Sequence, residues 1–91
     1  MKFLNLLDSV KKQVNVIIKT LGYENVNFSV ELSKPGFGDI TCNVAFLLAK
    51  QLKKNPYEIS KKMEPLFDFN KIPEFKRVNA HPTGNLNFEI N

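Results

Sequence analysis

Hydrophobic and polar positions follow two different periods in the first third of the chain, and these periods predict a helix and then a strand. Apolar residues recur every three or four positions over residues 3–21, which predicts an amphipathic helix that ends at Gly22. Its apolar face comprises Phe3, Leu7, Val10, Val14, Ile17, Ile18 and Leu21. Strict alternation over residues 26–32 then predicts a half-exposed strand. The apolar face of this strand comprises Val26, Phe28, Val30 and Leu32.

The central stretch, residues 38–52, predicts the helix around which the other elements pack. Asp39 is placed to cap its amino end, directly after the flexible residues 33–38. One stripe at helical spacing comprises Thr41, Val44, Ala45, Leu48 and Leu52. Further apolar residues beside this stripe indicate a helix that is buried over most of its circumference.

A third helix is predicted from residue 55, because Asn55 can cap it and Pro56 suits the first helical position. Its apolar side comprises Ile59, Met63 and Leu66. Pro65 should end or kink this helix. Residues 67–73 then form a connector with apolar anchors.

The end of the chain predicts two strands, residues 75–80 and 85–91, joined by a turn at residues 81–84. In the last strand the apolar side comprises Leu86, Phe88 and Ile90, and the polar side comprises Asn85, Asn87, Glu89 and Asn91. The order α-β-α-α-β-β predicts an α+β fold, a small antiparallel β-sheet with helices packed on one face and water on the other. No linker or repeat divides the sequence, so we expect a single domain over residues 1–91.

Composition narrows the class of protein. A chain of 91 residues with 43% hydrophobic residues can bury one core. Its single Cys excludes an intramolecular disulfide and favours a cytoplasmic compartment, and no apolar run is long enough to cross a membrane. We expect a monomer.

Catalytic and metal-binding patterns are absent from the sequence. One His and one Cys give no metal-ligand spacing, and Gly36-Phe37-Gly38 lacks the rest of a nucleotide-binding fingerprint. Cys42 is predicted to be a small core residue, and His81 is either an exposed turn residue or part of a site. The chain is therefore interpreted as a binding module and not as an enzyme.

Two features indicate a binding surface, although each has a simpler reading. Residues 50–62 contain five lysines and one acidic residue, Glu58, so this segment carries a charge of +4, equal to the net charge of the whole chain. Such a concentration of charge favours a polyanion as the partner. The alternative is that these lysines simply form a solvated face. These lysines are Lys50, Lys53, Lys54, Lys61 and Lys62, and Lys76 and Arg77 add to the positive potential. Asn85 and Asn87 could hydrogen-bond base edges, or they could simply fill an exposed strand face.

Three motifs in series resemble the N-terminal additional domain of arginyl-tRNA synthetases. They are Gly-Asp-Ile-Thr-Cys-Asn and its apolar continuation to Ala-Lys (residues 38–50), Asn-Pro-Tyr-Glu-Ile (residues 55–59) and Thr-Gly-Asn-Leu-Asn-Phe (residues 83–88). The resemblance implies a domain that docks on the elbow of a tRNA and contacts its D-loop, so tRNA is the expected partner and DNA is not. Asn85 stands where the family usually has Phe, whose ring could stack on an unpaired base.

The resemblance also implies which residues bind tRNA and that catalysis belongs to a separate domain. The expected tRNA-binding residues are Asn85, Asn87, His81, Gly84, Lys50, Lys53, Lys54 and Arg77. The family's catalytic domain, which binds ATP and arginine, has no counterpart in this sequence, so we expect no cofactor here and no ligase activity from this chain alone. It is either part of such an enzyme or a free-standing relative. The alternative function is a protein-interaction or assembly module, in which apolar residues of the first helix or an open sheet edge meet a partner chain.

Overall fold

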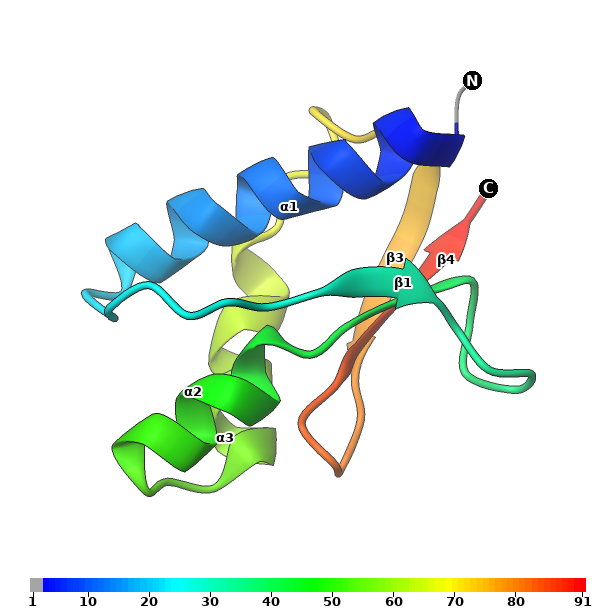
Figure 1. The fold of residues 1–91 in the computed structure, drawn as a ribbon. Coiled ribbons are helices and arrows are strands. Elements are labelled where there is room, and N and C mark those ends of the chain that lie inside the picture. Colours follow the sequence, from blue (N-terminus) through cyan, green and yellow to red (C-terminus); the bar gives the residue numbers. More distant parts are fainter. Residues whose placement is uncertain (1–2) are drawn as a thin grey trace.

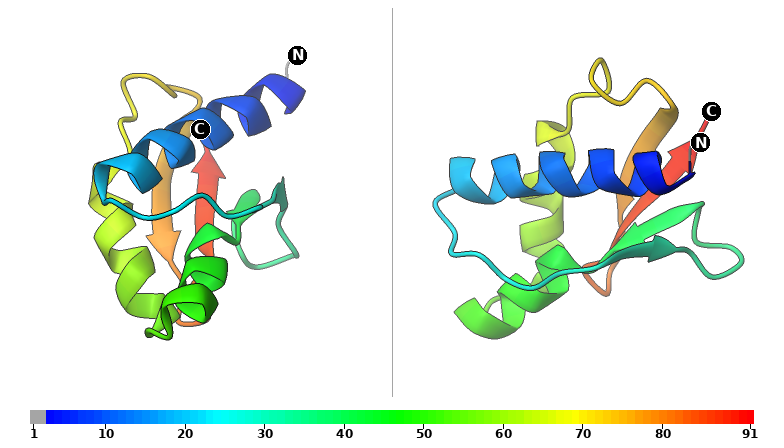
Figure 2. Two further views of the ribbon diagram at one scale, coloured as in Figure 1. Left: turned by 60° about the vertical axis from the view of Figure 1, so that its left-hand side comes forward. Right: turned by 45° about the horizontal axis from the view of Figure 1, so that its top comes forward.

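A four-stranded antiparallel sheet carries the helices on one face in the computed structural model, which describes residues 3–91 (Figure 1). The elements are α1 (Phe3–Thr20), β1 (Val30–Leu32), β2 (Ile40–Cys42), α2 (Val44–Leu52), α3 (Pro56–Met63), a 3₁₀ turn η1 (Glu64–Leu66), β3 (Phe75–Ala80) and β4 (Leu86–Ile90). The strand order is β1-β2-β4-β3, and each neighbouring pair is antiparallel. Figure 2 shows the helical layer in front of the sheet in its left view. The predicted α+β class, with helices on one face, is confirmed.

The core lies between the sheet and the helices. Phe88 on β4 is fully buried, and its ring meets Phe67 and Phe75 edge-to-face at centroid distances of 5.1 and 5.6 Å. The helix α1 contributes Val10, Val14, Ile17 and Ile18, all of them buried. The predicted apolar face of the first helix is therefore confirmed, except that the side chain of Phe3 lies outside the described residues.

The predicted central helix is wrong over its first six residues. Residues 40–42 form β2 instead, and α2 begins only at Val44. Asp39 caps no helix: its N–H donates to the carbonyl of Phe88 at 2.8 Å, and its Oδ2 accepts the N–H of Ile90 at 2.8 Å. Residues 40–42 form a strand because they pair with β1 on one side and with β4, which is distant in the sequence, on the other.

The burial of this helix was also overestimated. Leu52 is 37% exposed and Phe46 is 40% exposed, so α2 buries a stripe and leaves one side in water. The predicted strand over residues 26–32 is likewise shorter in the structure, because only residues 30–32 pair with β2. Its predicted apolar face ends early, since Leu32 is 68% exposed.

The second half of the chain follows the predictions closely, except that Leu66, which was expected on the apolar side of the third helix, lies in η1 and is 41% exposed. Asn55 caps α3, and its Oδ1 accepts the N–H groups of Tyr57 at 2.8 Å and Glu58 at 3.2 Å. The α-helix ends before Pro65, which lies in η1. Phe67 and Ile72 anchor the connector in the core. The strand β3 has the predicted bounds, and β4 is one residue shorter at each end.

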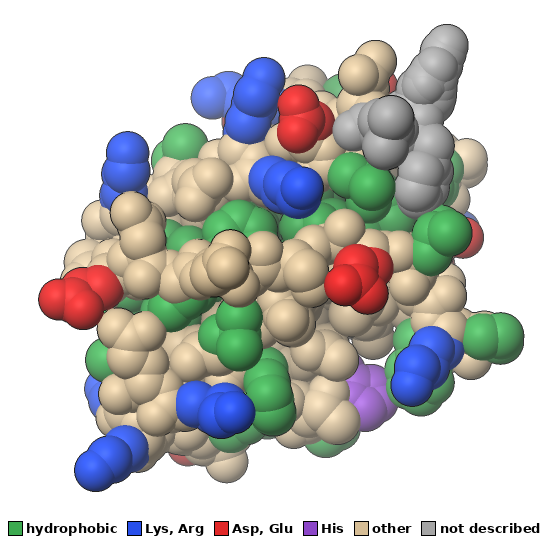
Figure 3. All heavy atoms as spheres, viewed as in Figure 1, with side chains coloured by type: hydrophobic (Ala, Val, Ile, Leu, Met, Phe, Trp, Pro, Cys, Tyr) green, Lys and Arg blue, Asp and Glu red, His purple; other side chains and the backbone are tan. Residues whose placement is uncertain are grey.

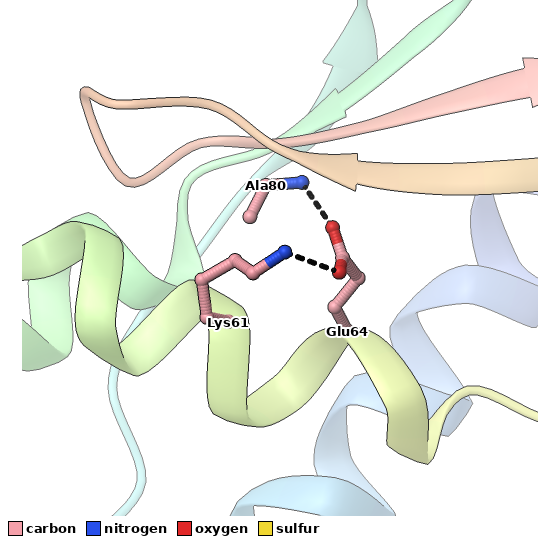
Figure 4. Close-up of polar contacts among 3 residues, drawn as sticks. All are labelled: Lys61, Glu64 and Ala80. Carbon is pink, nitrogen blue, oxygen red and sulfur yellow. Dashed lines mark hydrogen bonds and ion pairs between the residues drawn. The ribbon is translucent and has the colours of Figure 1, made fainter.

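A carboxylate ties the helical layer to the edge strand β3 (Figure 4). Oε2 of Glu64 accepts the N–H of Ala80 at 2.7 Å, and Oε1 accepts from Nζ of Lys61 at 3.0 Å. The hydrogen bond to Glu64, and then its charge, raise the pKa of Lys61. One outward N–H of this edge strand is therefore satisfied within the chain, which makes strand addition there less favourable.

The cap of α3 can be tested by the substitution Asn55→Ala. Loss of the side-chain acceptor leaves two backbone N–H groups without their partner, and we expect the free energy of unfolding to fall by about 1 kcal/mol. Urea denaturation measures this change. Asn15→Ala on the exposed side of α1 is the control and should stay within about 0.5 kcal/mol of the parent chain. Equal effects of the two substitutions would contradict the capping role.

Candidate nucleic-acid interface

The face of the sheet opposite the helices is polar. The strand register places Glu31, Thr41, Asn87 and Asn79 in one row across β1, β2, β4 and β3. Directly opposed residues of antiparallel strands point to the same face, so these four side chains share one surface. The prediction of a helix-free polar face is therefore confirmed.

A hollow of about 390 Å³ lies on this open face. Its lining residues are Ser29, Glu31, Leu32, Lys34, Phe37, Thr41, Asn43, His81, Thr83, Asn85 and Asn87. Three of the predicted site residues, His81, Asn85 and Asn87, are thus brought together. The hollow combines amides and hydroxyls with one lysine, one glutamate, one leucine and the rings of Phe37 and His81.

Asn87 forms part of the floor, and its predicted exposure is wrong, because only 8% of the residue is exposed. Its Oδ1 accepts the hydroxyl proton of Thr41 at 2.9 Å, and the Thr41 oxygen lies 2.6 Å from Oγ of Ser33. Thr41 has a single proton to donate, so Ser33 must donate to Thr41. This relay uses one acceptor position of the Asn87 amide oxygen and fixes the orientation of the amide. The N–H donors of Nδ2 make no hydrogen bond within residues 3–91, and they are what Asn87 offers first to a ligand.

The turn between β3 and β4 forms the rim of the hollow. The N–H of His81 donates to the carbonyl of Asn85 at 2.8 Å, which closes the turn. Nδ1 of His81 accepts the N–H of Thr83 at 3.2 Å and lies 2.9 Å from its hydroxyl oxygen. The ring of His81 also meets the ring of Phe37, with centroids 5.3 Å apart and planes at 69°. The ring of His81 is therefore held by Thr83 on one side and by Phe37 on the other.

Gly84 lies beneath this turn and not in the hollow. Its backbone has φ +98°, and a Cβ at this position would collide with Pro56 at the start of α3. Its carbonyl accepts the hydroxyl of Ser60, a fully buried residue of α3. The structural role of Gly84 is to let the turn dock on the helix, which places His81 and Asn85 at the rim.

The lysines of residues 50–62 form two groups and not one patch. Lys50, Lys53 and Lys54 lie at the end of α2 and in the turn after it. Lys61 and Lys62 lie in the last turn of α3, roughly 8–9 Å along that helix from Pro56 at 1.5 Å per residue. On the face drawn in Figure 3, basic side chains appear at separate points with acidic ones between them. The concentration of charge expected from the sequence is therefore weaker in space.

Of the first group, Lys54 lies two residues before Pro56, which contacts Gly84 below the rim, whereas Lys50 lines a different hollow beside Asn27. Arg77 lies on the open face opposite Glu89, with Nε 3.7 Å from Oε1. This neighbouring carboxylate partly offsets its charge.

Other chemistries find little support. No group of three His, Cys, Asp or Glu residues that could hold a metal occurs within residues 3–91. Cys42 is buried in the core as predicted, and burial raises the pKa of its thiol to about 12, which keeps the thiol protonated at neutral pH. No helix in the described part of the chain is long and apolar enough to cross a membrane.

Comparison with known proteins assigns a family to this fold. The family model described as the arginyl tRNA synthetase N terminal domain matches residues 5–90. The chain therefore belongs to the arginyl-tRNA synthetase N-terminal domain family, and the resemblance of the three motifs is confirmed.

Individual relatives agree with this assignment. The arginine–tRNA ligase of Aquifex aeolicus is 43% identical over 84 residues, which cover 89% of this chain and 14% of that protein. The arginine–tRNA ligase of Thermotoga maritima is 34% identical, with 91% of this chain and 15% of that protein covered. The arginyl-tRNA synthetase of Thermus thermophilus superposes with a TM-score of 0.78 at 22% identity, over 93% of this chain and 14% of that chain, which supports the fold. The chain thus spans about one-seventh of the length of these relatives.

The docking role of Gly84 can be tested against Gly36, which also has a positive φ, +89°, but has nothing within 4 Å of an added Cβ. We expect Gly36→Ala to lower the free energy of unfolding by about 1–2 kcal/mol through backbone strain alone. Gly84→Ala should lower it by about 1–3 kcal/mol more, because the methyl group also displaces Pro56. Urea denaturation measures both values. Equal values for the two variants would rule out a tight contact at this turn.

Proposed function

We propose that this chain is the tRNA-binding domain of an arginine–tRNA ligase and that it docks on the D-loop and elbow of the tRNA. The observation that carries the proposal is the hollow on the open face, where His81, Asn85 and Asn87 converge on a surface that no helix covers. Membership of the arginyl-tRNA synthetase N-terminal domain family supports the same partner. Aminoacylation itself, with ATP and arginine, belongs to a catalytic domain outside this sequence.

The chemistry of binding is recognition and not reaction. Nδ2 of Asn87 offers donors to an acceptor on an unpaired base, while the amide of Asn85 at the rim can both donate and accept. Lys50, Lys53 and Lys54 attract phosphates, which positions the tRNA without reading its sequence. In this proposal the domain acts as a cytoplasmic monomer that holds the tRNA for the catalytic domain.

The reading role is tested by Asn85→Ala, whose side chain is half-buried at the rim of the hollow. Losing one or two hydrogen bonds should weaken binding of the cognate tRNA about 5- to 10-fold. Fluorescence anisotropy with labelled tRNA at fixed salt measures the affinity. Asn79→Ala, on the same face but outside the hollow, is the control and should change the affinity less than about twofold. If Asn85→Ala lowers the affinity for a scrambled RNA as much as the affinity for the tRNA, this result would count against a reading role of Asn85.

The positioning role of the lysines is tested by the double variant Lys53→Gln with Lys54→Gln. Fewer counterions are released when two phosphate contacts are lost, so affinity should fall for every RNA and the dependence on salt should become shallower by about one to two charges. The control is Lys61→Gln with Lys62→Gln, because Lys61 already pairs with Glu64. If the salt dependence is unchanged in the Lys53/Lys54 variant, or changes equally in the two double variants, the turn after α2 is not part of the interface.

A further inference from the structure

Phe37 is an aromatic side chain placed among polar groups. It is 42% exposed and lines the hollow on the open face, together with Lys34, Thr41, Asn85 and Asn87. Single exposed hydrophobic residues are common and need no explanation. What distinguishes Phe37 is its setting, because it lies in a concave site that is lined mainly by amides, hydroxyls and charged groups, with Leu32 as the other apolar side chain.

The loop that carries Phe37 is anchored to the sheet. The N–H of Phe37 donates to the carbonyl of Lys34 at 3.1 Å across a turn with Pro35 and Gly36 in its centre, and Gly36 has φ +89°. Pro followed by a residue of positive φ is the pattern of a type II turn. The base of the loop is held by Asp39, which bonds to β4 through both its N–H and its carboxylate. Phe37 is therefore presented on a short and tethered hairpin.

The position of the ring over the sheet follows from the register. The loop of residues 33–39 leaves the sheet beside the Ile40–Phe88 pair, whereas the turn of residues 81–85 leaves it beside the Cys42–Leu86 pair. These are opposite ends of the β2–β4 ladder, yet the rings of Phe37 and His81 lie 5.3 Å apart. Both side chains must therefore lean over the open face, and together they form an aromatic wall beside the floor made by Thr41 and Asn87.

We propose that Phe37 is the stacking platform for an unpaired nucleobase of the RNA bound in this hollow. The proposal rests on the proposed function and adds a residue that contacts the base through its face, while Asn85 and Nδ2 of Asn87 meet its edge. Aromatic side chains stack on unpaired bases in most proteins that bind single-stranded RNA segments. The volume of about 390 Å³ lies within the range of about 300–1,000 Å³ that is usual for small-ligand sites.

The first arm of the test compares Phe37→Leu with Phe37→Tyr. Leucine keeps an apolar side chain but removes the ring, so affinity for tRNA should fall about 5- to 30-fold; tyrosine keeps the ring and should stay within about threefold. Val16→Ala is the control, since it removes an apolar side chain that is 63% exposed on α1 outside the hollow, and it should stay within about twofold. Circular dichroism checks that each variant remains folded.

The second arm uses the absence of Trp from the sequence. Phe37→Trp places a single indole in the hollow, and stacking on a base should quench most of its fluorescence as tRNA is added. Val16→Trp reports the same fluorophore on the exposed side of α1 and should show little quenching.

The outcomes separate the two proposals. If the parent chain does not bind tRNA, the proposed function fails and the stacking role fails with it. If the parent chain binds but Phe37→Leu binds equally well, or Phe37→Trp is not quenched, stacking by Phe37 is overturned while the tRNA-binding function stands. Selective loss with Phe37→Leu together with selective quenching of Phe37→Trp supports the stacking role.

Discussion

The alternation of side chains on β4 is the constraint on which both the core and the candidate site depend. Leu86 and Phe88 point into the helical layer, while Asn87 points to the open face between them. A slip of one residue would place Asn87 in the core and Phe88 in water, so the register must be held firmly. The aromatic contacts of Phe88 hold it from within, and the two bonds from Asp39 to β4 hold it from the side of β2.

The same register prepares the floor of the hollow for binding. It sets Thr41 opposite Asn87, and the relay from Ser33 through Thr41 then fixes which end of the Asn87 amide meets a ligand. A side chain that is already oriented loses little conformational freedom when a partner binds. The turn at residues 81–84 is prepared in a similar way, because Gly84 and Ser60 dock it on α3. The recognition proposed for this domain thus depends on its backbone architecture as much as on its surface residues.

Local signals in the sequence predicted the local features of the fold. The cap at Asn55, the end of α3 before Pro65 and the alternation in the last strand all depend on neighbours within a few residues, and all three are present. The strand β2 could not be predicted in this way, because its three residues, 40–42, fit the apolar spacing of a helix equally well. Only their pairing with β1 on one side and β4 on the other identifies them as a strand. Phe37 was missed as a candidate for the same reason. Its place beside His81 depends on a loop that folds over the sheet from the opposite end.

Charge contributes in a more limited way than the sequence suggested. The lysines of residues 50–62 divide between two ends of α3, and Arg77 shares the open face with Glu89. The hollow itself holds one lysine and one glutamate beside its amides, hydroxyls and two aromatic rings. This arrangement supports the proposal that the domain recognises a folded RNA by its shape and by a few exposed bases more than by total charge.

The proposed function depends above all on whether the polar face of the sheet is the surface that meets RNA. The most direct measurement is a nuclear magnetic resonance titration of the isotope-labelled chain with tRNA, followed through the side-chain amide signals of its asparagines. If the polar face is that surface, the signals of Asn85 and Asn87 should shift or broaden first, while those of Asn15 on α1 and Asn70 in the connector stay unchanged. Shifts confined to asparagines outside the hollow, with Asn85 and Asn87 unaffected at saturating tRNA, would contradict this role of the polar face.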